Sequence, residues 1–294
     1  MNLKLLLVLT VTLVLQSTGG LAYTLYFTHR EILDDLQSQP LVVMLQDENP
    51  QELKRMADKP AELAQYKASV AMHNNQAQQL IRQFWTVSST IEFKSESELP
   101  ALQKDKQHAT LVLYRKQLRL GYSDSRVGTF LETEWRLDLA GGRREVYSFD
   151  APLPPTTVTA ADIISALRNL QFQIRDEQVR MTKTEQPKAK VQLRDYSQRL
   201  RTKTLLIDKE GLKDKFTEAN LQKAYPYPHR LATPEEIEAA VLTADPRYTY
   251  VRNLSSFTYV IDAATGEQLT GVEGDMKWGA GEFSRFVAAI KRGE

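Results

Sequence analysis

Leu41-Val42-Val43-Met44-Leu45 is a short run of apolar residues, and the acidic segment Asp47-Glu48-Asn49-Pro50 ends it. Such a run is typical of a strand in the interior of a sheet. Between Pro60 and Phe84, apolar residues recur every three or four positions, which predicts one long helix with a single buried stripe. The stripe consists of Leu63, Tyr66, Val70, Ala77, Leu80, Ile81 and Phe84. A buried strand followed by an amphipathic helix indicates an α/β fold.

The rest of the first half continues the alternation of strands and helices. We predict strands at 90–93 and 109–114, a hairpin of 135–139 and 144–149, and a helix from Thr159 with Ile163, Leu167, Leu170 and Ile174 on one face. Ser95 and Glu98 are three positions apart and match a capping box for a short helix. Gly141 and Gly142 supply the turn of the hairpin.

The second half repeats this order. We predict strands at 203–207, 229–231 and 248–251, a helix at 212–224, a hairpin of 258–262 and 267–269, and a last helix at 281–291. Thr233, Pro234 and Glu236 indicate another helix start, with threonine as the cap and proline in the first helical position. The segment from Asp262 to Gly266 is interpreted as an aspartate-glycine hairpin turn.

The repeated order predicts two tandem small α/β domains with mixed sheets, each built as strand, helix, strand, helix, strand, hairpin and helix. The first three strands of each domain are expected to be parallel, and the hairpin to add antiparallel strands at an edge. A duplication is supported because Trp85 to Ala109 and Tyr225 to Tyr248 each span about two dozen positions. Residue identity between the halves is low, so an accidental match is the alternative.

The amino terminus has the pattern of a secretion signal. Apolar residues extend to Leu15, a polar break follows, and the small residues Gly20 and Ala22 fit a signal-peptidase site before Tyr23. The apolar run covers roughly a dozen residues, whereas about 20 are needed to cross a bilayer. We therefore expect a cleaved signal peptide at 1–22, with an uncleaved anchor as the alternative. The mature protein is predicted to be periplasmic or secreted, without stable membrane insertion.

The predicted domains are 23–180 and 203–294, joined by a basic linker at 181–202. Lysine and arginine dominate this linker against only Glu185 and Asp195, and it holds Pro187 and little apolar periodicity, which favours a solvated segment. The mature chain of about 270 residues is long enough for two hydrophobic cores.

Composition excludes several classes of function. The chain has no cysteine, which rules out disulfides, thiolate chemistry and thiolate zinc sites. Its 38 lysines and arginines balance 37 aspartates and glutamates, so no strong field attracts nucleic acid. The four histidines, His29, His73, His108 and His229, lack the close spacing of zinc ligands. Glycine-rich phosphate loops and the GxSxG serine motif are absent, and we expect no cofactor, no metal site and no catalytic residues.

Ligands of open α/β sheets bind beyond the carboxyl ends of the parallel strands. The residues that follow the first predicted strand of each half are therefore candidate ligand-binding residues, namely Asp47, Glu48, Asp208 and Glu210. A carboxylate there can hold a cation, a ribose hydroxyl or an amine, although a helix cap or a polar strand exit accounts for it equally well. Tyr225, Tyr227 and His229 form a second candidate group, because this histidine directly follows the segment Tyr225-Pro226-Tyr227-Pro228.

The sequence favours an exported, non-catalytic binding or envelope-associated protein, whose partner is an unknown small molecule or envelope protein. The alternative is a carboxylate- or metal-dependent extracytoplasmic hydrolase. A thioredoxin-like scaffold without its cysteines, acting as a docking module, is a third possibility. No motif carries a resemblance to a particular family.

Overall fold

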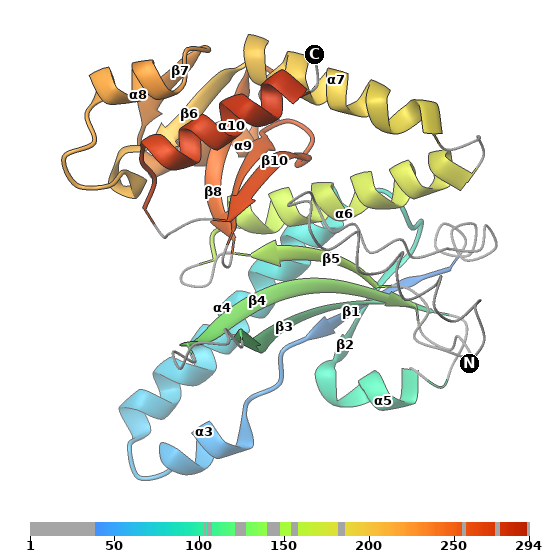
Figure 1. The fold of residues 1–294 in the computed structure, drawn as a ribbon. Coiled ribbons are helices and arrows are strands. Elements are labelled where there is room, and N and C mark those ends of the chain that lie inside the picture. Colours follow the sequence, from blue (N-terminus) through green and yellow to red (C-terminus); the bar gives the residue numbers. More distant parts are fainter. Residues whose placement is uncertain are drawn as a thin grey trace, which may run out of the picture.

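The computed structural model describes residues 39–102, 104, 108–120, 128–139, 148–153, 158–181, 186–254, 257–273 and 277–292. It is a mixed α/β fold with two five-stranded sheets (Figure 1). The predicted signal peptide at 1–22, His29 and the glycine turn of the first hairpin lie outside the described residues.

The first sheet has the strand order β2-β1-β3-β4-β5. Its strands are β1 (Leu41–Leu45), β2 (Ile91–Ser95), β3 (Ala109–Leu120), β4 (Gly128–Leu139) and β5 (Ser148–Leu153). The helices of this half are α3 (Pro50–Arg55), α4 (Pro60–Phe84), the 3-10 helix η1 (Glu96–Glu98), α5 (Leu99–Leu102) and α6 (Ala160–Met181). β1 is parallel to β2 and β3, whereas β4 is antiparallel to β3 and β5, as expected. The third strand is longer than predicted, because β3 pairs with β4 as far as Leu120.

The second sheet has the strand order β10-β9-β8-β6-β7. Its strands are β6 (Thr204–Asp208), β7 (His229–Ala232), β8 (Tyr248–Leu254), β9 (Phe257–Asp262) and β10 (Gln268–Glu273). The helices of this half are α7 (Gln186–Thr202), the 3-10 helix η2 (Lys209–Gly211), α8 (Glu218–Ala224), α9 (Pro234–Leu242) and α10 (Ala280–Arg292). β6 is parallel to β7 and β8, and the antiparallel strands β9 and β10 extend the sheet to one edge.

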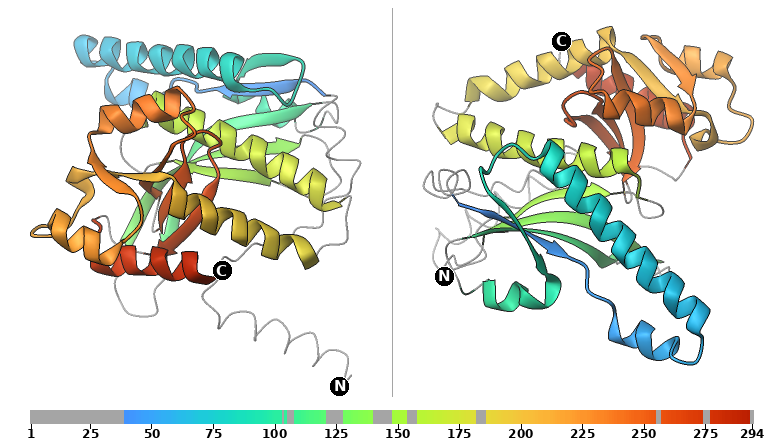
Figure 2. Two further views of the ribbon diagram at one scale, coloured as in Figure 1. Left: turned by 90° about the horizontal axis from the view of Figure 1, so that it is seen from above. Right: turned by 180° about the vertical axis from the view of Figure 1, so that it is seen from behind.

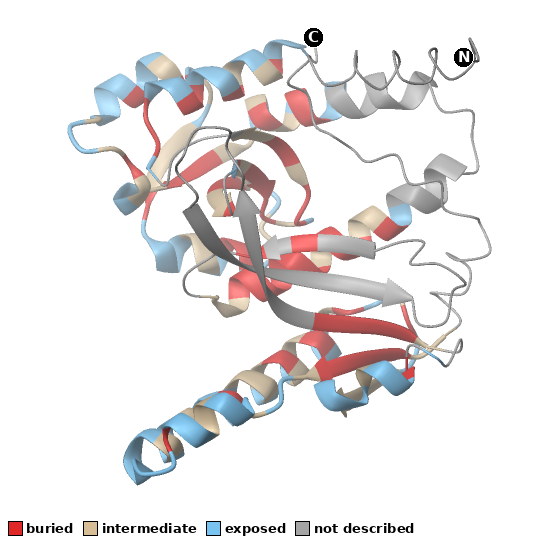
Figure 3. Ribbon diagram, turned by 60° about the horizontal axis from the view of Figure 1, so that its bottom comes forward, coloured by how far each residue is buried: buried red, intermediate tan, exposed pale blue. Residues whose placement is uncertain are grey.

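Helix α4 lies across one face of the first sheet (Figure 2). Its predicted stripe is confirmed, with Val70, Ala77 and Ile81 buried and Trp85 buried directly after the helix. Burial is strongest toward the carboxyl end, whereas α3 and the first turns of α4 are largely exposed (Figure 3). The apolar stripe therefore anchors only part of this long helix to the sheet.

Helix α6 lies between the two sheets (Figure 1). Its predicted face of Ile163, Leu167, Leu170 and Ile174 is buried in the core of the first sheet. A second face, with Ala161 and Ile164, is buried in a core that contains strands of the second sheet. One helix thus serves both halves, which a single amphipathic stripe does not reveal.

Two predictions of local structure are corrected. Much of the expected solvated linker at 181–202 is helix α7, because Tyr196 and Leu200 are buried in the core of the second sheet. The helix expected from Leu212 begins only at Glu218, because Leu212 forms a β-bridge with Trp278. Among the described helices, none combines the length and apolarity needed to cross a bilayer.

Candidate functional site

Asp47 lies beyond the carboxyl ends of β1 and β2, where the sequence analysis places it. Its carboxylate accepts hydrogen bonds from Ser95 Oγ at 2.7 Å and from the Ser97 backbone N–H at 2.9 Å. The Ser95 hydrogen bond lowers the pKa of Asp47, while burial acts in the opposite direction. Burial, together with the Asp47 charge, raises the pKa of Glu96 beside it. Asp47 therefore joins the end of β1 to the start of η1.

The other strand-end candidates also hold local structure. Glu48 forms an ion pair with Lys67 of α4 at 3.3 Å. Asp208 caps η2 by accepting the backbone N–H of Glu210 at 2.9 Å, and Glu210 is exposed. The two pairs of candidates belong to different sheets, so the structure supplies two separate strand ends and no single acidic site.

The aromatic candidates belong to the core of the second sheet and its margin. Tyr225 is fully buried, and its hydroxyl donates to the Leu200 carbonyl at 2.9 Å. Burial raises the pKa of this phenol well above its usual range. Tyr227 packs edge-on against Tyr225 at 5.5 Å, and His229 Nδ1 donates to the Tyr227 carbonyl at 2.8 Å. These contacts connect β7 to the segment that follows α8.

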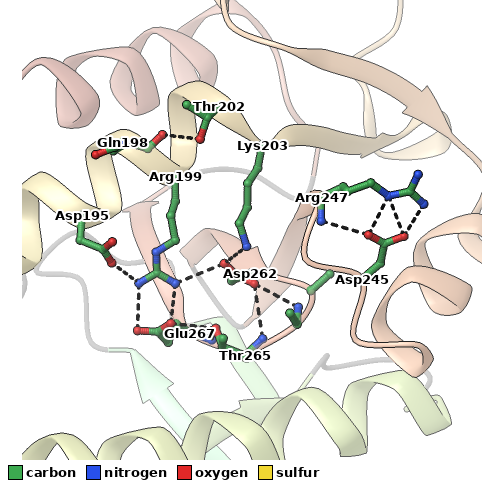
Figure 4. Close-up of polar contacts among 12 residues, drawn as sticks. Asp195, Gln198, Arg199, Thr202, Lys203, Asp245, Arg247, Asp262, Thr265 and Glu267 are labelled. Atoms are coloured by element: carbon green, nitrogen blue, oxygen red, sulfur yellow. Dashed lines mark hydrogen bonds and ion pairs between the residues drawn. The ribbon is translucent and has the colours of Figure 1, made fainter.

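A buried charge cluster surrounds the turn between β9 and β10 (Figure 4). Arg199 of α7 donates to Glu267 at 2.5 and 3.1 Å and to Asp262 at 3.2 Å. Lys203 donates to Asp262 at 2.5 Å, and the side chain of Asp262 is 0 % exposed. Asp195 pairs with Arg199 at 2.6 Å. Sequence reasoning missed this cluster because Arg199 lies in the expected linker at 181–202, and Lys203 lies in the predicted strand that follows it.

The same turn contacts α6 on its other side. Gly266 has a φ of +72°, in the left-handed region that the predicted turn requires. A Cβ at Gly266 would lie 2.6 Å from the Ser165 carbonyl oxygen. Asn169 Nδ2 donates to the Gly266 carbonyl at 3.0 Å, and Arg168 donates to the Ala263 carbonyl at 3.0 Å. The turn is therefore held from both sides, by α6 and by α7.

A small cavity lies where α6 meets β5 and the second sheet, with both apolar and polar lining residues. Arg252 forms an ion pair with Asp162 at 2.7 Å, and the Tyr250 hydroxyl donates to Ser165 Oγ at 2.7 Å. Burial raises the pKa of Tyr250, which keeps the phenol protonated. The cavity holds about 10 Å³, the space of a single water molecule. It is too small for a substrate.

A larger, open groove lies between α8 and the first turns of α10. Its volume is about 450 Å³, which falls in the usual range of ligand sites. The groove is lined by Phe216, Asn220, Lys223, Ala224, Ala280 and Ser284. Within the part of the chain that the structure describes, no group of three histidine, aspartate or glutamate side chains is placed to hold a metal ion.

Searches against protein-family models, curated proteins and solved structures found no match for this chain.

Proposed function

We propose that this is an exported, non-catalytic binding or envelope-associated protein, whose partner is a small molecule or an envelope protein. One observation carries the proposal: the polar residues at the strand ends hold the fold. Asp47 and Asp208 cap the segments that follow their strands, and Glu48 is paired with Lys67. A carboxylate saturated by backbone and serine donors is stabilised in its charged form and is a poor general base.

The test is a turnover screen of the purified mature protein against broad hydrolase and transferase substrates. We expect no turnover, and Asp47→Asn and Asp208→Asn should change only stability. The matched control is Asp58→Asn, an exposed acid between α3 and α4. Reproducible turnover that either strand-end substitution abolishes, and that the control retains, would refute the proposal.

One observation favours the hydrolase alternative. Asp47, Ser95, Glu96 and Ser97 gather beyond two parallel strands, and the Ser95 and Ser97 hydroxyl oxygens are 2.5 Å apart. A carboxylate- or metal-dependent enzyme would use such a place. Thermal melting with magnesium, manganese or calcium distinguishes the metal-dependent enzyme from the binding protein, since a cation that binds the folded state raises the melting temperature. We expect no shift at millimolar cation, and a shift lost in Asp47→Asn would support the enzyme.

We further propose that the leader at 1–22 is removed on export and that the mature chain begins at Tyr23. The small residues Gly20 and Ala22 support this site. Amino-terminal sequencing of the protein recovered outside the cytoplasm should begin at Tyr23. An intact leader on membrane-bound protein would support the anchor instead.

We infer that the two halves are duplicated domains. Supporting the inference, each sheet has its first strand between its second and its third strand, and two antiparallel strands follow beyond the third. The proposed domains are 23–180 and 203–294, and the segment between them includes α7. If the halves share an ancestor, profiles built separately from homologues of each half should align in the same strand register. An alignment no better than that of unrelated α/β domains would contradict the duplication.

A further inference from the structure

The groove between α8 and α10 is lined by the six residues named above, and the ring of Phe216 forms its apolar side. Phe216 stacks on Phe283 with ring centroids 5.9 Å apart and ring planes within 8°. Phe283 is fully buried in the core of the second sheet, whereas Phe216 is half-buried. The core therefore holds the Phe216 ring in place at the groove. Ala224 and Ala280 add small apolar side chains to the lining.

The polar lining offers hydrogen-bond donors. The Asn220 side-chain oxygen already accepts from the Thr217 backbone N–H at 3.1 Å and from the Thr217 hydroxyl at 2.7 Å. The amide NH₂ group of Asn220 supplies the donors of this side chain. Lys223 adds three further N–H donors, and Ser284 adds a hydroxyl. A ligand with acceptor oxygens suits this lining.

The charge of the lining has one sign. Lys223 is the only charged residue among the six, so none of the described residues that line the groove supplies a carboxylate. Glu282, which also lies in α10, is buried and engaged with the Gly279 backbone N–H at 2.8 Å and with Lys213 at 3.3 Å. Because the Glu282 carboxylate already accepts a backbone N–H at the amino terminus of α10, this helix terminus adds little attraction for an anion. A complementary ligand therefore carries a negative charge, which would pair with the Lys223 ammonium group.

We propose that this groove binds a small organic carboxylate with a flat apolar body. The apolar body packs on Phe216, and the carboxylate accepts hydrogen bonds from Lys223 and Asn220. The inference rests on the proposed binding function and names the chemical class of its ligand. Since the groove is open and the charge pair is hydrated, the dissociation constant of a minimal ligand should be on the order of millimolar.

The test uses 4-fluorobenzoate as the probe and 4-fluorobenzamide as its neutral counterpart. Fluorine NMR line broadening with the full mature protein should report binding of the carboxylate and weaker binding of the amide. Lys223→Gln should weaken 4-fluorobenzoate binding about fivefold, which corresponds to the loss of one exposed ion pair. Lys209→Gln, an exposed lysine outside the lining, should leave binding unchanged. Phe216→Leu should weaken both probes.

Equal binding of the two probes, or equal affinity of wild type and Lys223→Gln, would overturn the proposal. Absence of broadening at millimolar probe would do the same. The Lys223 side chain is at the surface, so its replacement should leave the melting temperature unchanged and the comparison valid. Loss of carboxylate binding leaves the non-catalytic function standing, whereas turnover in the enzyme screen would reject that function without reference to the groove.

Discussion

Replacing Arg199 by glutamine should destabilise the fold strongly, because this guanidinium compensates buried carboxylates. The Arg199 side chain is 18 % exposed, and those of its partners Glu267 and Asp262 are 7 % and 0 % exposed. Without Arg199, the side-chain partner that the described residues leave to the Glu267 carboxylate is the Thr265 hydroxyl at 2.8 Å. Asp262 keeps Lys203 at 2.5 Å and the backbone N–H groups of the turn. Within the described part of the chain, the substitution thus leaves the buried Glu267 carboxylate without a counter-charge.

Removing one partner of a buried ion pair costs about 3–5 kcal/mol. Because Asp262 retains Lys203, we expect a loss at the lower end, about 3 kcal/mol.

Urea denaturation followed by tryptophan fluorescence measures this loss as a lower midpoint at unchanged slope. The matched control is Arg247→Gln, which breaks an ion pair with Asp245 at 2.6 Å at a site where the Arg247 side chain is 72 % exposed. The control should lose much less stability than Arg199→Gln, because its ion pair is exposed to solvent. The reasoning fails if the two variants lose equal stability at neutral pH.

Three other outcomes follow from single residues. Gly266→Ala should lower the free energy of unfolding by at least about 2 kcal/mol, because Gly266 has a φ of +72° and an added Cβ would clash with α6. In the control Gly281→Ala, the new Cβ meets open space, so the change should be neutral or stabilising by up to about 1 kcal/mol. Equal melting temperatures of the two variants would contradict the strain assigned to Gly266. The pKa of Asp47 is lowered in the folded state, so its contribution to stability is present above the unfolded pKa and is lost as pH falls through the folded pKa. Acid denaturation curves of Asp47→Ala and wild type should therefore differ at neutral pH and converge at low pH. NMR titration should give Asp245 a pKa of about 2, which Arg247→Gln returns toward about 3.9; an unchanged value would assign the shift to another cause.

Local signals in the sequence were sufficient for most of the helices and strands. Helix α4 follows from its stripe, and α9 starts at the Thr233 cap with the predicted capping box. The parallel order of the first three strands in each sheet follows from the helical connections between them. These features depend on residues a few positions apart, which interact within one element and leave a periodic pattern.

The tertiary structure alone decided the role of α7 and the candidate site. Arg199 is 63 positions from Asp262 and 68 from Glu267, and no periodicity links residues so distant. In the sequence, Tyr196 and Leu200 stand among many charged residues, so the α7 segment resembles a solvated linker. The sequence does not show that one of these charged residues, Arg199, is paired with carboxylates inside the fold. In the same way, the sequence indicates a free carboxylate at Asp47, whereas in the folded protein Ser95 of the neighbouring strand donates a hydrogen bond to it. Composition and local pattern determine which elements form, whereas compensation between distant charges determines which polar residues are left for a ligand.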